Sequence, residues 1–227
     1  MIKLQKTQPA PASLSSQECQ DTLSAIKQKR ANGEMVTSED YKSLYGKDDV
    51  RKQLKDDQHC KCAYCEKTLI DEPKHVEHYR PKSRYPDLAF TWDNLLGSCW
   101  ACNIKKWNNF PLEDESKRYT SQEVPLLINP YNDDPADYIE FHEEEARPKS
   151  GLTGIMRQKA ETTMEMLLKR PDLVYRRRCA WRKYKDFLLA VSHIRRDSID
   201  YGRFQNLINE YMVDEHEFAG MFRYQRP

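Results

Sequence analysis

The sequence predicts a mainly α-helical protein with a small metal-organised module between N-terminal and C-terminal helices. Apolar residues recur at helical spacing in both terminal regions of the chain. Five of the seven cysteines fall within residues 60–102, and the 227 residues include only seven glycines. Clustered cysteines favour a metal site, and scarce glycine disfavours an all-β fold with many tight turns.

Four segments are expected along the chain. They are an arm with helices over 1–57, the metal module over 58–112, an acidic irregular connector over 113–153, and a helical region over 154–227. In the first segment, Ser15 or Ser16 can cap a helix that runs to about Arg30. In the last segment, Pro171 ends one helix and starts the next, which extends to about Arg196.

Charge is unevenly distributed, although the formal net charge is only +1. Residues 113–148 carry three basic and 11 acidic groups, whereas residues 149–227 carry 16 basic and ten acidic groups. The basic runs 176–178, 182–183 and 195–196 are expected to face outward on one long helix. Such a face is either solvated or a surface for nucleic acid or an acidic partner.

Composition and local pattern exclude several classes of protein. No apolar run reaches the roughly 18–20 residues of a transmembrane helix, and residues 1–6 lack the apolar region of a secretory signal. An odd cysteine count without such a signal argues against a disulfide scaffold. A cytoplasmic protein without membrane contact is therefore expected. In the acidic connector, the alternation over 138–142 predicts one short strand.

Cys62-x2-Cys65 and Cys99-x2-Cys102 form two metal-binding knuckles. Two intervening residues let one turn aim both thiolates at one ion, and two such turns complete a tetrahedral Zn²⁺ site. Four thiolates leave no open coordination position, so this zinc would be structural. The alternatives are redox-active thiols and a site in which Cys60 replaces Cys62.

A second set of chemical groups lies between and after the knuckles. A histidine beside a carboxylate, with an asparagine on the following helix, supplies a base and two oxygen ligands of the kind that Mg²⁺ or Mn²⁺ prefers. Lys82, Arg84, Lys105 and Lys106 add positive charge directed at phosphate. A base, a divalent metal and cations are the components of a phosphodiesterase site. A zinc ribbon with surface charges is the alternative.

The spacing of these residues resembles that of the HNH endonuclease family. The resemblance rests on Cys62-x2-Cys65, Glu77-His78-x2-Pro81, Asn94 and Cys99-x2-Cys102-Asn103, within about 58–112. It implies a ββα-metal core of zinc-knuckle, treble-clef-like type. Outside this core, residues 1–14, the box over 61–66 and the stretch 126–135 resemble the PtuB family, the HNH subunits of Septu-type bacterial anti-phage systems.

The resemblance also implies a role for each polar residue. His78 would be the general base, which suits a side chain with an ordinary pKa of ~6.5. Glu77 and Asn103 would hold one Mg²⁺ or Mn²⁺ at the scissile phosphate, and Asn94 would fix the loop that orients His78. Adjacent residues of a regular strand point to opposite faces. Glu77 and His78 can therefore share one phosphate only if the strand ends or bulges there.

The tryptophans and lysines near the second knuckle have competing interpretations. Trp92, Trp100 and Trp107 are expected in the core rather than stacked on bases. Lys105 and Lys106 are either phosphate contacts or part of a solvated helix face.

These features predict a metal-dependent HNH nuclease that hydrolyses phosphodiester bonds, with DNA as the first candidate substrate. The PtuB resemblance implies an effector subunit of an anti-phage defence complex whose partner is PtuA, an ABC-type ATPase. Related subunits accompany retrons, so a reverse transcriptase and its RNA–DNA are further candidate partners. The alternatives are a ribonuclease, for instance one that cleaves transfer RNA, and a non-catalytic zinc-knuckle adaptor that binds nucleic acid or protein.

Overall fold

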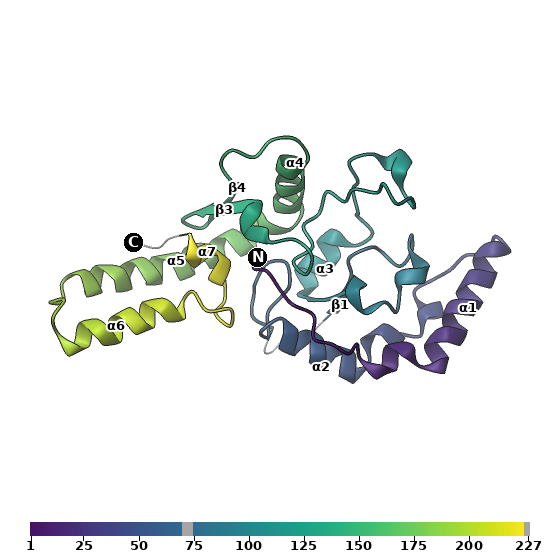
Figure 1. The fold of residues 1–227 in the computed structure, drawn as a ribbon, viewed down its shortest axis with the longest axis horizontal. Helices are drawn as coiled ribbons and strands as arrows, with labels where there is room; N and C mark the ends of the chain where they lie inside the picture. Colours follow the sequence, from purple (N-terminus) through teal and green to yellow (C-terminus); the bar gives the residue numbers. More distant parts are fainter. Residues whose placement is uncertain (70–74, 225–227) are drawn as a thin grey trace. The chain divides into compact units, whose positions relative to one another are not determined.

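The computed structural model describes residues 1–69 and 75–224 and is mostly helical, which confirms the predicted fold class (Figure 1). Its helices are α1 Gln17–Ala31, α2 Asp48–Asp57, α3 Trp100–Lys106, α4 Gly154–Thr163, α5 Pro171–Ser192, α6 Ile199–Glu210 and α7 Ala219–Arg223. Its strands are β1 His75–His78, β2 Leu95–Ser98, β3 Ile139–His142 and β4 Glu145–Pro148. Among these helices, none has the length and apolar character needed to cross a bilayer.

The described chain forms two compact units. One consists of residues 4–63 and 68–125, and the other of residues 1–3, 64–67 and the chain from 126 onward. The N-terminal helices and most of the predicted metal module therefore share one unit, whereas residues 64–67 of that module are assigned to the other.

The first unit begins with α1, which starts at one of the two predicted caps. The Ser16 side chain accepts a hydrogen bond from the backbone N–H of Cys19 at 3.3 Å, which satisfies one of the free N–H groups at the helix start. The helix ends at Ala31, close to the predicted Arg30. Two short 3₁₀ turns, Glu39–Tyr41 and Leu44–Gly46, then lead into α2.

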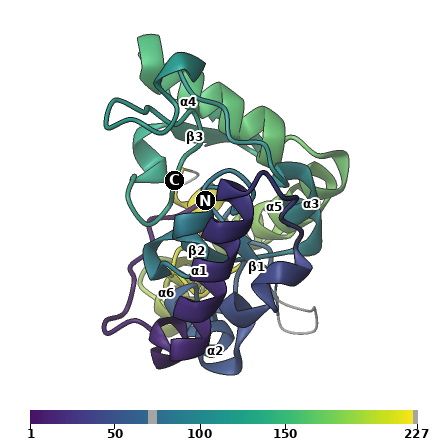
Figure 2. The same ribbon diagram turned by 90° about the vertical axis from the view of Figure 1, so that its right-hand side faces the viewer.

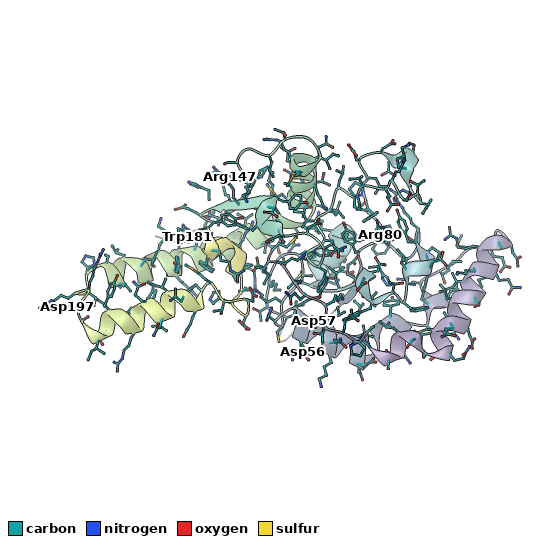
Figure 3. The ribbon with its side chains drawn as sticks, in the orientation of Figure 1. Asp56, Asp57, Arg80, Arg147, Trp181 and Asp197 are labelled. Carbon is teal, nitrogen blue, oxygen red and sulfur yellow. The ribbon has the colours of Figure 1, made fainter. Side chains whose placement is uncertain are left out.

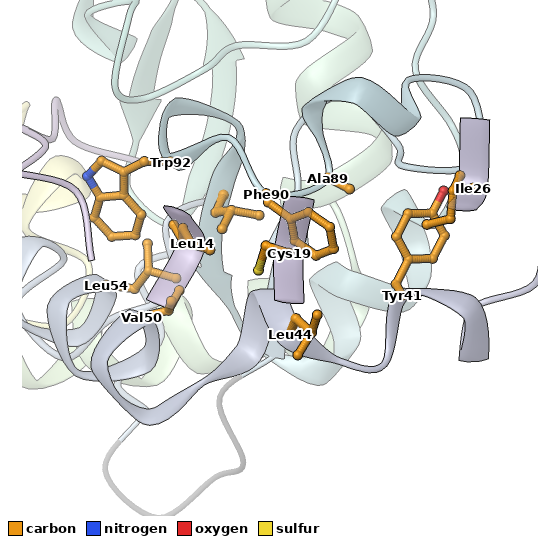
Figure 4. Packing of buried hydrophobic residues seen from close by; sticks show 11 residues of the cluster. Leu14, Cys19, Ile26, Tyr41, Leu44, Val50, Leu54, Ala89, Phe90 and Trp92 are labelled. Atoms are coloured by element: carbon orange, nitrogen blue, oxygen red, sulfur yellow. The ribbon is translucent and has the colours of Figure 1, made fainter. Parts of the chain in front are cut away.

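One hydrophobic cluster joins these helices to the strand region of the same unit (Figure 4). The cluster consists of Leu14, Cys19, Ile26, Tyr41, Leu44, Val50, Leu54, Ala89, Phe90, Trp92 and Leu95. Trp92 is buried, as predicted for a core residue. Because residues from 14–54 and 89–95 bury one another's apolar surface, they stabilise a common core.

The two strands of this unit and the helix that follows them form a ββα arrangement. β1 pairs antiparallel with β2, with His75 opposite Ser98 and His78 opposite Leu95. α2 packs beside β2 (Figure 2), and α3 begins two residues after Ser98. The Cys99 sulfur accepts from the backbone N–H of Cys102 at 3.4 Å and so serves as the N-cap of α3.

In the second unit, β3 and β4 form an antiparallel hairpin, and α5 and α6 run side by side (Figure 1). β3 is the predicted strand, and β4 is a partner that the sequence did not indicate. The rings of Phe187 and Phe204 lie 5.5 Å apart between α5 and α6. Figure 3 places Asp197 in the connection between these two helices.

Two expectations about α5 are wrong. The helix ends at Ser192 rather than near Arg196, so the basic run 195–196 lies in the connection to α6. Arg177 does not face outward, because it is only 2% exposed. Its guanidinium donates at 2.7 Å to the backbone oxygen of Leu168, the last residue of a π-helical turn, and so satisfies a buried carbonyl at the end of that turn.

Other basic residues of α5 pair with the acidic connector. Arg178 lies 2.6 Å from a carboxylate oxygen of Glu144, and Lys185 lies 3.1 Å from one of Glu143. Both glutamates lie in the turn between β3 and β4. The opposite charges of the two segments therefore partly compensate each other within this unit.

Candidate active site and metal centre

The end of α2 directs the chain into the first knuckle. The N–H groups of His59 and Cys60 donate to the carbonyls of Asp56 and Lys55 at 3.2 and 2.9 Å. His59 and Cys60 have φ of 52° and 57°, so the helix closes with left-handed residues in the Schellman pattern. The N–H of Leu69 returns to the Cys60 carbonyl at 2.8 Å and closes the knuckle.

A buried glutamine ties this knuckle to β2. The Gln58 side-chain amide donates to the carbonyls of Gly97 and Lys61 at 2.8 and 2.9 Å, and its oxygen accepts from the Gly97 N–H at 2.7 Å. A Cβ at Gly97 would lie 3.0 Å from the Gln58 nitrogen, so a larger residue would require this amide to move by a few tenths of an ångström. The Ala63 N–H also donates to the Gly97 carbonyl at 3.0 Å.

Gln58→Ala is expected to lower the free energy of unfolding of the zinc-loaded protein by at least about 2 kcal/mol. The reason is that the Gly97 N–H stays buried without its acceptor and a cavity replaces the side chain. Chemical denaturation measures this change. Gln53→Ala is the matched control, because Gln53 donates only to the Thr7 and Pro9 carbonyls at exposed positions. Equal losses for the two variants would contradict a special role for Gln58.

The two knuckles bring four sulfurs together. The Sγ atoms of Cys62, Cys65, Cys99 and Cys102 all lie within 4.8 Å of one another, and all four residues are buried. Sulfurs of a tetrahedral zinc site are ~3.8 Å apart at a Zn–S distance of ~2.3 Å, so this donor set fits zinc. Cys60 is half-buried and outside the cluster, so the alternative in which it replaces Cys62 is wrong.

His78 is the last residue of β1 and is 5% exposed. Its Nε2 lies 3.0 Å from the carbonyl oxygen of Ala89, and its ring meets that of Tyr45 edge-on at 4.6 Å. A carbonyl can only accept, so the Nε2 of a neutral imidazole carries the hydrogen and Nδ1 keeps its lone pair. Burial, reinforced by the charge of Lys82, lowers the pKa of His78 to about 3, so the ring is neutral at pH 7.

Asn94 joins the two segments that flank His78. Its side-chain amide donates to the carbonyls of Arg80 and Leu88 at 3.0 and 3.1 Å, and its oxygen accepts from the Arg80 N–H at 2.8 Å. Leu88 precedes Ala89, which bonds the imidazole, and Arg80 lies two residues after His78. A single buried amide therefore fixes the backbone on both sides of the ring.

Glu77 and Lys106 form a buried ion pair. The Lys106 ammonium lies 2.8 Å from Oε1 of Glu77 and also donates to the His78 carbonyl at 2.7 Å. Burial raises the pKa of Glu77 and lowers that of Lys106, and the pairing opposes both shifts. Lys106 is 0% exposed, which differs from the accessible position expected of a phosphate contact.

Lys106→Met is expected to cost about 3–5 kcal/mol of unfolding free energy, because it leaves a buried carboxylate without its partner. Lys105→Met is the matched control, since Lys105 is exposed on the same helix, and it should change stability by no more than about 0.5 kcal/mol. Denaturant titration of both variants provides the measurement. A Lys106→Met protein as stable as the control would show that the pair contributes little.

Glu77, His78 and Asn103 line one cavity of about 650 Å³ in the first unit. Its lining residues are Val36, Thr37, Ser38, Tyr41, Ser43, Tyr45, Gly46, Arg51, His75, Val76, Glu77, His78, Pro81, Lys82, Ser83, Asn103, Trp107 and Asn108. Glu77 and His78 reach the same cavity although they are adjacent, and β1 ends at His78. Of the four predicted phosphate contacts, Lys82 is among the lining residues, whereas Arg84 and Lys105 are exposed elsewhere.

Sequence reasoning missed the contribution of the 36–51 segment to this cavity. The Tyr41 hydroxyl donates to the Lys82 carbonyl at 2.8 Å, and the Lys82 ammonium donates to the Tyr45 hydroxyl at 3.3 Å. Burial raises the pKa of Tyr41 to about 12, so this hydroxyl stays protonated. Arg51 adds a second cation, held by a 2.7 Å bond from its Nε to the Gly46 carbonyl.

A residue of the acidic connector also holds the chain beside the cavity through contacts that are distant in sequence. The Glu123 carboxylate accepts from Arg80 at 2.9 Å, from the Tyr85 hydroxyl at 2.8 Å and from the Tyr119 N–H at 3.0 Å. Arg80, labelled in Figure 3, thereby links the turn after β1 to this connector. One acidic residue among 11 in residues 113–148 thus belongs to the site's scaffold.

Two of the three tryptophans near the site are not core residues, contrary to the prediction. Trp100 is 61% exposed and Trp107 is 66% exposed, with Ile104 between them also exposed. The buried face of α3 is instead formed by Cys102 and Lys106. Because α3 turns its thiolate and its lysine inward, residues 100, 104 and 107 lie on its solvent side.

Comparison with known proteins agrees with this geometry. A family model described as HNH endonuclease matches residues 62–109. The Septu protein PtuB of Bacillus mycoides (strain KBAB4) is 34% identical over 165 residues, which cover 62% of this chain and 55% of that protein. The Septu protein PtuB of Bacillus thuringiensis is 38% identical over 101 residues, which cover 44% of this chain and 35% of that protein.

A retron-associated protein is also similar. A candidate HNH endonuclease of retron Vc95 from Vibrio cholerae serotype O1 biovar El Tor is 25% identical over 193 residues, which cover 80% of this chain and 90% of that protein. The matched stretches thus span only about half and a third of the two Septu proteins. The resemblance predicted from the motifs is confirmed.

Proposed function

Because the chain belongs to the HNH endonuclease family and is homologous to Septu PtuB proteins, we propose that it is a metal-dependent nuclease. It would hydrolyse phosphodiester bonds in nucleic acid, with DNA as the first candidate. The observation that supports this most is that Glu77, His78 and Asn103 line a single cavity together with Lys82. An adaptor would need the four cysteines but none of these groups.

His78 has the geometry of a general base. Its Nε2–H is held by the Ala89 carbonyl, so Nδ1 is the atom that would accept a proton from the attacking water. The ring is neutral at pH 7, so Nδ1 carries no proton, and the lowered pKa makes His78 a weaker base than the ordinary imidazole with a pKa of ~6.5. Asn94 would act as a positioning residue, because it holds the backbone on both sides of the imidazole.

Glu77 and Asn103 are suited to hold Mg²⁺ or Mn²⁺, since a carboxylate and an amide oxygen line the same cavity. When bound, the ion would neutralise charge that develops on the phosphate and the departing oxygen. Lys106 would keep the Glu77 carboxylate ionised in its buried position. Lys82 and Arg51 would attract the phosphate backbone.

The relatives suggest a defence complex. We propose that the chain is the effector subunit of a bacterial anti-phage system and acts with PtuA, an ABC-type ATPase. The sequence contains no Gly-x4-Gly-Lys-Ser/Thr phosphate loop, so nucleotide control would come from such a partner. A retron reverse transcriptase with its RNA–DNA is a further candidate partner, on the strength of the Vibrio relative.

Incubation of the purified chain, with and without the ATPase partner, with DNA and RNA under Mg²⁺, Mn²⁺ or EDTA tests this proposal. Cleavage that requires the divalent ion is expected, with DNA cut in preference to RNA. Cleavage of RNA alone would assign a ribonuclease. Binding of nucleic acid or of the partner without any cleavage would show that the chain is a non-catalytic adaptor.

A further inference from the structure

Trp107 occupies an unusual position in the cavity. It is the residue that ends α3, it lines the cavity with Asn103 four residues earlier, and it is 66% exposed. Within residues 1–69 and 75–224, its ring makes no aromatic or cation–π contact. A large apolar side chain is therefore displayed at the proposed reaction centre without an aromatic or cationic partner among the described residues.

The backbone of Trp107 is also strained. Its φ of 42° and ψ of −125° lie in a region that glycine adopts readily and bulky residues rarely adopt. The usual positive-φ residue at a helix end is a glycine in the left-handed α region, and the ψ of Trp107 lies outside that region as well. A tryptophan at this position therefore opposes the local backbone preference, and unfavourable conformations of this kind cluster at functional sites.

The rest of the cavity indicates which ligand the ring would meet. Lys82 and Arg51 supply positive charge suited to phosphate, and Arg51 has no carboxylate partner among the described residues. Every nucleobase has a flat π face that stacks on an aromatic ring. Cations beside an exposed tryptophan are thus the combination that binds a nucleotide strand by its backbone and its bases.

Stacking on a protein ring requires a base that is not already stacked in a duplex. We propose that Trp107 stacks on an unpaired base beside the scissile phosphate, so that the preferred substrate is single-stranded or locally unpaired nucleic acid. This inference rests on the proposed nuclease function. It adds that the substrate is unpaired at the cleavage site.

Binding without cleavage separates this inference from the nuclease proposal. Fluorescence anisotropy of the zinc-loaded protein without added Mg²⁺ or Mn²⁺, with a labelled single strand and the matching duplex, should give an affinity at least about 10-fold tighter for the single strand. Trp107→Ala should weaken single-strand binding about 10-fold or more and leave duplex binding almost unchanged. Trp100→Ala is the matched control, since Trp100 is equally exposed on α3 but is not among the cavity's lining residues.

A glycine variant distinguishes a binding role from a structural one. Trp107→Gly should raise the thermal midpoint or leave it unchanged, because glycine accepts this backbone, and it should still lose single-strand affinity. Equal affinity for duplex and single strand, or full single-strand affinity in Trp107→Gly, would overturn the inference. So would a Trp107→Ala protein that binds nucleic acid normally but no longer co-elutes with the ATPase, because the ring would then contact a protein.

Strand preference and cleavage are separate outcomes. Trp107-dependent binding of single strands without any metal-dependent cleavage would refute the nuclease proposal and keep the stacking contact. Cleavage of single strand and duplex at equal rates, unaffected by Trp107→Ala, would refute the stacking contact and keep the nuclease.

Discussion

His78→Ala is expected to reduce phosphodiester cleavage by at least about 10²-fold, because a positioned general base contributes roughly 10²–10⁴-fold to such a reaction. The variant removes the Nδ1 that would accept the water proton, while the groups proposed to hold metal and phosphate remain. Cleavage of a labelled substrate under Mg²⁺ measures the loss. His142→Ala, at an exposed residue of β3, is the matched control and should keep full activity.

His78→Ala also leaves the buried Ala89 carbonyl without a donor, so its stability must be followed in parallel. His78→Asn is a second variant that retains an N–H group but has no basic nitrogen. Loss of cleavage in both variants, with an unchanged unfolding midpoint in at least one, supports the base assignment. Full cleavage by folded His78→Asn would contradict it.

Cys102→Ser is expected to abolish zinc retention and to give unfolded or insoluble protein. Structural zinc contributes about 10–16 kcal/mol in small zinc-finger peptides, comparable to the whole stability of a typical domain. Cys102 is completely buried and is also the residue whose N–H is capped by the Cys99 sulfur. Metal analysis should find about one Zn²⁺ per wild-type chain, and circular dichroism should report the loss of fold.

Cys60→Ser is the matched control for this substitution, because Cys60 lies two residues before the cluster but outside it. It should retain one zinc and a wild-type spectrum. A soluble, zinc-free Cys102→Ser protein with a native spectrum would show that the metal is not part of the fold.

The metal centre and the residues nearest to it could be predicted from spacing alone. Pairs of cysteines separated by two residues constrain both sulfurs of a turn, so Cys62, Cys65, Cys99 and Cys102 were identifiable without a structure. The same holds for elements with strong local signals, such as the Ser16 cap of α1 and the start of α5 at Pro171. In each case the determining contact lies within a few residues.

The cavity wall could not be predicted, because its contacts are distant in sequence. Tyr41 meets Lys82 across 41 positions, and Arg80 meets Glu123 across 43. Tyr41 and Tyr45 have the spacing of ordinary core residues, and nothing local shows that they face a histidine and a lysine. Glu123 likewise resembles any other glutamate of the acidic connector.

The sequence also failed to predict which charged side chains are buried and which aromatic rings are exposed. Lys106 is buried because it donates to oxygens of Glu77 and His78. Arg177 is buried because it donates to the backbone oxygen of Leu168. Trp100 and Trp107 are exposed because the short α3 turns Cys102 inward. Composition favours the opposite assignment for all four residues, and only tertiary contacts reverse it.

The contact between Gln58 and Gly97 has a consequence for the order of folding. It spans 39 positions, so it closes a long loop whose entropic cost is met only when several interactions form together. Gly97 lies two residues before Cys99 and pairs in β2 with Val76 of β1. A chain that has not paired its strands therefore offers an incoming ion two thiolates rather than four. Pairing of β1 with β2 and completion of the four-thiolate site are therefore expected to occur together, so the zinc-binding step also brings Glu77 and His78 of β1 into place.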